Sequence, residues 1–89
     1  MAIYTVTYDL LNPGKNYDRI TGRVAQYDSH KAQYSQWLVN TAGSASELRA
    51  DLSNYIDAND KLAVFVITPK MWASANMPLM AEWLAARGH

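Results

Sequence analysis

A continuous apolar run near the end of the chain limits the folds that this sequence can adopt. Residues 62–68 read LAVFVIT, and Pro69 ends the run. An unbroken series of β-branched and aromatic side chains is typical of a strand that is covered on both faces. The preceding DAND at residues 57–60 is turn chemistry, which bounds the strand at its other end. The fold must therefore supply cover for two faces of this strand.

The first third of the chain predicts a strand and then a helix. Residues Ile3–Asp9 alternate aromatic and β-branched side chains as a strand does. Residues 12–15, Asn-Pro-Gly-Lys, predict a type II turn, and Asn16 predicts the N-cap of the helix that follows. The apolar positions of this helix recur at helical spacing and are Tyr17, Ile20, Val24 and Tyr27.

The middle of the chain predicts a hairpin and a second helix. Residues 29–41 predict a ragged strand near His30–Tyr34 and a firmer one over Gln36–Thr41. Ser44 and Glu47 have the spacing of a capping box, which predicts a helix start. The apolar face of this helix is Ala45, Leu48, Leu52, Tyr55 and Ile56.

A third helix is predicted over Met77–Arg87, capped by Asn76 and stopped by Gly88. It has little polar face and is expected to be covered nearly all round. The complete order predicts an α+β, ferredoxin-like βαββαβ antiparallel sheet with an added C-terminal helix. We expect a single domain over residues 1–89, with its core at residues 3–68. Two helices cover only one face of such a sheet, so the last helix, a second copy of the chain, or both must cover the other. We therefore expect a homodimer.

Charge and composition exclude several classes of protein. Eight Lys and Arg balance eight Asp and Glu, which is not typical of a strong non-specific nucleic-acid binder. A local basic patch of Lys15, Arg19, Arg23 and Lys31 could still bind nucleic acid, although we prefer to interpret these residues as the solvated face of a helix. The absence of cysteine excludes disulfides and thiolate sites. No secretory signal or membrane-spanning run is visible, so we expect a cytoplasmic protein without membrane contact.

Asp9 is the candidate for chemistry, because it stands where the first strand ends. It either bonds backbone amides near Asn12, as Asp does in turns, or joins a second Asp9 across a dimer axis to hold Mg²⁺. Ser35 has no His and acid partner set for a hydrolase triad. His30 could act on phosphate or be a plain surface residue. Trp37, Trp72 and Trp83 could stack on bases, but packing is the simpler interpretation.

Several stretches resemble a known family. The chain carries YTVTYDL at its first strand, QYSQWLV at the hairpin and DANDKLAVFVIT near its end. These resemble the small CRISPR-associated nuclease-fold subunit used in spacer acquisition, which is related to the virulence-associated protein D toxins. The stretch YDLLNPGKNY also resembles a set of small bacterial proteins with no established activity.

The resemblance implies a ferredoxin-like homodimer that pairs through its sheets. It implies that Asp9 is a catalytic residue and metal ligand, that the hydroxyl residue Ser35 is catalytic, and that Asp57 and Asp60 form an acidic turn. The chain differs from the family in its neutral charge and its shortened hairpin, and its apolar last helix replaces an extra strand that docks a larger protein partner. The implied function is a weak Mg²⁺-dependent endonuclease acting on RNA or DNA, or a degenerate nucleic-acid-binding relative. The alternative is a non-catalytic dimeric interaction or regulatory module of a defence or toxin system.

Overall fold

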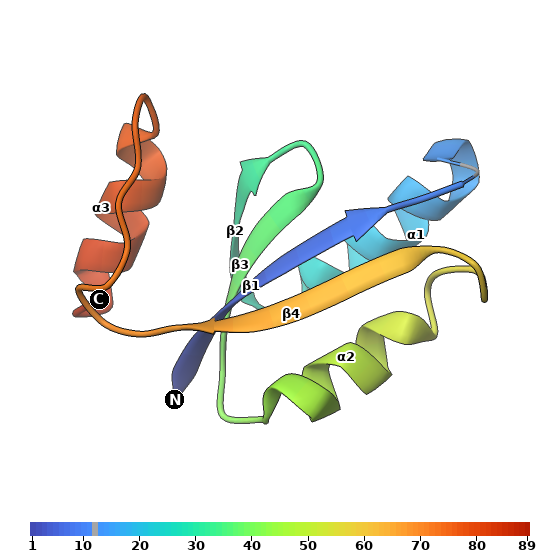
Figure 1. Cartoon of the computed structure of the whole chain (residues 1–89), viewed down its shortest axis with the longest axis horizontal. Coiled ribbons are helices and arrows are strands. Elements are labelled where there is room, and N and C mark those ends of the chain that lie inside the picture. Colours follow the sequence, from blue (N-terminus) through green and yellow to red (C-terminus); the bar gives the residue numbers. More distant parts are fainter. Residues whose placement is uncertain (12) are drawn as a thin grey trace.

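The chain folds as an α+β, ferredoxin-like domain with an added C-terminal helix, as predicted. A computed structural model describes residues 1–89 apart from residue 12, and it describes no side chains at residues 13–16. The strands are β1 (Ala2–Asp9), β2 (Asp28–Gln33), β3 (Gln36–Thr41) and β4 (Lys61–Ile67). They form one antiparallel sheet in the order β2-β3-β1-β4, shown in Figure 1. The helices are α1 (Pro13–Val24), α2 (Ala45–Ser53) and α3 (Pro78–Ala86).

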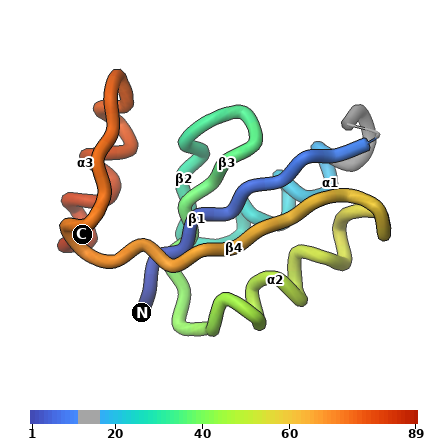
Figure 2. Tube along the Cα trace, viewed as in Figure 1, coloured from blue at the N-terminus to red at the C-terminus, as the bar shows by residue number. Residues whose placement is uncertain are grey.

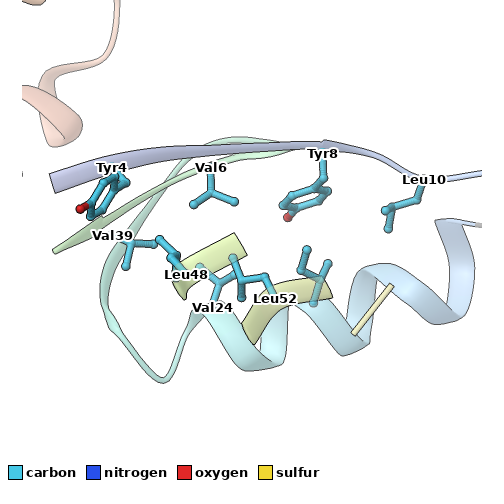
Figure 3. Packing of buried hydrophobic residues seen from close by; sticks show 9 residues of the cluster. Tyr4, Val6, Tyr8, Leu10, Val24, Val39, Leu48 and Leu52 are labelled. Carbon is cyan, nitrogen blue, oxygen red and sulfur yellow. The ribbon is translucent and has the colours of Figure 1, made fainter. Parts of the chain in front are cut away.

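The first sheet face packs on α1 and α2. Alternate residues of β1, from Tyr4 to Leu10, point into this layer because successive side chains of a strand point to opposite faces. Figure 3 shows them above the apolar side chains of the two helices. The buried residues of this core are Tyr4, Val6, Tyr8, Leu10, Ile20, Val24, Val39, Leu48 and Leu52. Trp37 packs against the same cluster, which confirms its predicted packing role.

The second sheet face is covered at one end by α3. Ile3 and Leu38 are buried there against Met80 and Leu84 of the helix. Trp72 and Trp83 pack against this cluster and are part of its cover, as the packing interpretation predicted. Figure 2 traces the chain from the end of β4 to α3, which lies apart from α1 and α2. The rest of this face carries half-buried Thr5 and Thr7 and is more polar than the sequence suggested.

The ends of α3 follow one prediction and contradict another. Gly88 adopts a φ of 73° just past the helix, where its N–H bonds the carbonyl of Ala85, and the N–H of His89 bonds that of Leu84. This pattern is a Schellman motif, so the predicted stop at Gly88 is confirmed. Asn76 is not the N-cap. It has a φ of 61°, and Met77 takes the cap position without a side-chain hydrogen bond.

Some of the other predictions of strand and helix bounds are confirmed, and others are not. The strand at Gln36–Thr41 and the capping box of Ser44 and Glu47 are confirmed. The preceding strand begins at Asp28, two residues earlier than predicted, and ends at Gln33. The N-cap predicted at Asn16 is wrong, because α1 begins at Pro13 and Asn16 lies inside it. The predicted type II turn is also wrong over residues 13–15, which are helical, and residue 12 lies outside the described residues.

The expectation that residues 62–68 are covered on both faces is wrong for the single chain. β4 lies at the margin of the sheet, and among the described residues it pairs with β1 alone. Phe65 and Val66 are 62% and 60% exposed, and they point to opposite faces because they are neighbours in a strand. The last helix is also less covered than expected, since Leu79 is exposed. The apolar run of β4 therefore keeps an open edge.

Candidate functional site

Asp9 lies at the end of β1, and its side chain is exposed. Its strand partner across the β1–β4 ladder is Lys61, on the same sheet face. A hollow of about 250 Å³ lies at this end of the two strands, lined by Thr7, Tyr8, Asp9, Lys61, Leu62 and Ala63. Four of these six residues belong to the second face by alternation, so the hollow opens on the face that α3 leaves bare.

The Asp9 carboxylate makes no hydrogen bond to any other described residue, and Asn12, its predicted partner region, lies outside the described residues. The neighbouring Leu11 amide instead donates to Oδ1 of Asp60, at 2.8 Å. Oδ2 of Asp60 accepts from the Asp57 amide, also at 2.8 Å. Asp60, in the acidic turn before β4, thus holds the loop after β1 in place by hydrogen bonding, and this role is structural.

Ser35 lies in the hairpin turn beside the end of β1, with its hydroxyl on the other side of the sheet from Asp9. Its carbonyl accepts from the Tyr8 amide at 3.2 Å, so the hairpin turn is hydrogen-bonded to the end of β1. Its hydroxyl shares a 2.8 Å hydrogen bond with the Tyr17 hydroxyl of α1, on the helix-covered side. Asp9 points to the opposite face from Tyr8 by strand alternation. The two predicted catalytic residues therefore do not converge on one point.

An aromatic cluster surrounds Ser35, and no sequence pattern indicated it. The Tyr17 ring lies 5.5 Å from that of Tyr8 and 5.1 Å from that of Tyr34. The indole N–H of Trp37 donates to the Tyr8 hydroxyl at 3.0 Å. Burial raises the pKa of Tyr8 more than this hydrogen bond lowers it, so the phenol is neutral at physiological pH. The cluster closes the hairpin onto α1 by packing and neutral hydrogen bonds.

The three predicted basic residues whose side chains are described do not form one surface. The Arg23 guanidinium makes an ion pair with Asp51 of α2, at 2.9 Å. Arg19 donates to the Asn54 carbonyl at 3.1 Å, beyond the end of α2. Lys31 lies on β2, with its ammonium 5.5 Å from the centre of the Tyr34 ring. Lys15 lies outside the described side chains. The two arginines therefore connect α1 to α2 and its C-terminal end. We call the ion pair of Arg23 with Asp51 the Arg23 clamp.

The Arg23 clamp also includes Tyr27, whose hydroxyl donates to the Asp51 carboxylate. The hydrogen bonds from Arg23 hold the pKa of Asp51 below its ordinary value. Burial and the bond to Asp51 raise the pKa of Tyr27. This cluster of opposite charge is satisfied within itself and offers no unpaired group to a substrate.

Metal ligands are sparse in the described part of the chain. No three His, Cys, Asp or Glu residues there lie close enough together to hold a metal ion. Mg²⁺ takes several oxygen ligands, and one exposed carboxylate at Asp9 does not by itself make such a site. A second carboxylate would have to come from another copy of the chain.

No protein-family model matches the chain, and no solved structure matches it. Among the described residues, no helix has both the length and the apolar character needed to cross a membrane.

Proposed function

We propose that this chain is a homodimeric, non-catalytic interaction module whose partner-binding element is β4. The observation that carries the proposal is the exposure of Phe65 and Val66, one on each face of an unprotected edge strand. An open, apolar strand edge presents a row of backbone donors and acceptors that an added strand satisfies. Such an edge is therefore suited to binding another strand.

Two further observations support a binding role over a chemical one. The Ser35 hydroxyl is engaged with Tyr17, and the Arg23 guanidinium is engaged with Asp51. Neither group is presented to a phosphate backbone. The net charge of zero also lowers the repulsion between copies, which favours self-association.

The resemblance to the CRISPR-associated subunit gives this proposal its biological setting. A dimeric module of a defence or toxin system, located in the cytoplasm, fits both the resemblance and an exposed edge that pairs with a second copy, and a larger protein partner would then bind another part of the dimer. RNA or DNA binding belongs to the second candidate.

The second candidate is a Mg²⁺-dependent nuclease at Asp9. The observation that favours it is the exposed carboxylate at a strand end, beside the hollow that Thr7, Lys61 and Ala63 help to line. When bound, Mg²⁺ would polarise a phosphoryl group and activate water. Oxygen ligands lie ~2.1 Å from Mg²⁺, so this function needs two Asp9 carboxylates within about 8 Å of each other.

Incubation of the pure protein with labelled RNA and DNA, in Mg²⁺, Mn²⁺ or EDTA, separates the two candidates. If the protein is an interaction module, we expect no metal-dependent cleavage, which is cleavage that EDTA abolishes. Asp9→Asn is the matched variant, because it removes the charge and keeps the size of the side chain. Metal-dependent cleavage by the parent protein that Asp9→Asn lacks would replace the module with the nuclease. Cleavage that is equal in both proteins would exclude Asp9 as the catalytic residue.

A further inference from the structure

We infer that β4 pairs antiparallel with β4 of a second copy, with Val64 at the two-fold axis and Phe65 of each copy filling the hollow beside Ala63 of the other. This inference rests on the proposed function and names its binding geometry. It joins two four-stranded sheets into one continuous sheet.

The charge on β4 selects the strand direction. Lys61 is the one charged residue of the strand KLAVFVI. A parallel in-register pair would place the two Lys61 ammonium groups side by side, and like charges directly opposite each other destabilise a sheet. An antiparallel pair separates them to opposite ends of the interface. A two-fold axis also closes the assembly after two copies, so the edge does not propagate into a fibre.

Side-chain size selects the register. A two-fold axis perpendicular to the sheet keeps each face on its own side, so only residues of the same face can oppose each other. Neighbouring registers then differ by a shift of the axis from Val64 to Ala63 or Phe65. An axis at Ala63 places Phe65 opposite Lys61, and an axis at Phe65 places the two phenyl rings opposite each other. The axis at Val64 pairs large Phe65 with small Ala63.

The same register also covers apolar side chains on the other sheet face. It places exposed Val66 opposite half-buried Leu62, so both apolar side chains gain cover. It places Lys61 opposite Ile67 rather than another charge. No apolar residue of β4 that is exposed in the single chain is left without an apolar neighbour in the pair.

The hollow gives the register an independent support. Ala63 lines a space of about 250 Å³ together with Thr7, Asp9 and Lys61, on the face where Phe65 of the second copy would lie. A phenyl ring placed against Ala63 has that space to occupy. The ring leaves its exposed position in one copy and is enclosed by the other.

This geometry also separates the two Asp9 residues. Asp9 is aligned with Lys61 in the β1–β4 ladder, and Lys61 is aligned with Ile67 of the second copy. Six residues at ~3.4 Å each and three strand spacings of ~4.8 Å place the two Asp9 backbones about 25 Å apart. They cannot share a metal ion at that distance. The pairing of β4 therefore excludes the nuclease site that the resemblance implies.

A size exchange tests the register. Phe65→Ala and Ala63→Phe should each weaken the dimer at least about tenfold in sedimentation equilibrium, because one opens a space and the other opposes two large rings. The double variant restores one large and one small residue at every contact, so its dissociation constant should return to within about threefold of the parent value. Circular dichroism of each variant checks that the monomer remains folded.

The outcomes separate the failure of the register from the failure of the proposed function. A parent protein that remains monomeric overturns both. A dimer that the double variant does not restore overturns the register and leaves the interaction module standing. Spin labels on Lys61→Cys give a second test, since the chain has no other cysteine. The two labelled backbones should lie about 20 Å apart. A much shorter distance, as in parallel pairing, would overturn the inference even if the size variants fail to fold.

Discussion

The two edges of the sheet differ in how they are protected. The β2 edge is polar, with the sequence DSHKAQ, and its pairing with β3 is irregular between Lys31 and Gln33. The β4 edge reads KLAVFVI and pairs with β1 in an unbroken register. Charges, irregularities and covering helices are the means by which proteins prevent strand edges from pairing. The β2 edge uses all three, whereas β4 has a single charge, Lys61, at its first residue.

The β2 edge also has a helix beside it. The Arg87 guanidinium, just past α3, donates to both carboxylate oxygens of Asp28, at 2.6 and 3.0 Å. The rings of His30 and Trp83 lie 6.1 Å apart, and Arg87 lies over the Trp83 ring. This fold can therefore protect an edge strand, and beyond Lys61 the rest of β4 lacks such protection. We interpret the open edge as a binding surface rather than a defect.

The largest expected effect concerns the helix that covers the β2 end of the sheet. Leu84 is 1% exposed, so Leu84→Ala should lower the free energy of unfolding by about 2–5 kcal/mol, measured by urea denaturation. Leu79→Ala on the same helix is the control, because Leu79 is 69% exposed and its loss should change the value by less than about 0.5 kcal/mol. Equal effects of the two changes would show that α3 does not pack as described.

The next effect contrasts a charge on each edge. Phe65→Lys should weaken dimerisation at least about hundredfold, because it places a cation in the apolar interface. Gln33→Lys adds the same charge to the β2 edge, at another exposed position, and should leave the dissociation constant unchanged. Analytical ultracentrifugation of both variants measures this contrast. A loss of dimer in Gln33→Lys with none in Phe65→Lys would reverse the roles of the two edges.

Sequence patterns identified the local elements of this chain because their signals are local. The Ser44 and Glu47 capping box and the strand at Gln36–Thr41 depend on spacings of a few residues. The same holds for Gly88, whose positive φ ends α3. Asn76 was predicted as a cap from its residue type, yet the backbone turns there with a positive φ and leaves the cap to Met77.

These local patterns do not predict which parts of the tertiary structure lie next to each other. The run at residues 62–68 has the composition of a covered strand, but composition does not state whether the cover comes from the same chain. The contact of Ser35 with Tyr17 joins residues that are 18 positions apart, and no spacing rule relates them. The Asp9 site likewise depends on where a second copy binds, which one sequence does not encode in its local pattern.

The smallest effect is a dependence of stability on pH. Hydrogen bonds from Arg87, and then from Asn40, hold the pKa of Asp28 below its ordinary value of 3.8. The Arg23 guanidinium does the same for Asp51. Their folded-state pKa values are lower than in the unfolded chain, so the stabilisation is complete above 3.8 and is lost as the pH falls through the folded-state values.

Urea denaturation of Phe65→Lys between about pH 6 and pH 2.5 measures this loss in the monomer. Arg87→Gln in that background should remove the Asp28 part, which for such an exposed pair is below about 1 kcal/mol. The change should flatten the pH dependence and leave the Asp51 part in place. An unaltered pH dependence would show that the ion pair beside the β2 edge contributes nothing to stability.

The mass of the protein in solution shows whether β4 binds a second copy of the chain. Light scattering across micromolar concentrations measures this mass. Pairing of β4 predicts twice the 10.0 kDa chain mass for the parent protein, and the single-chain mass for Phe65→Lys under the same conditions. A mass of one chain for the parent, or a dimer that Phe65→Lys leaves intact, would contradict the pairing.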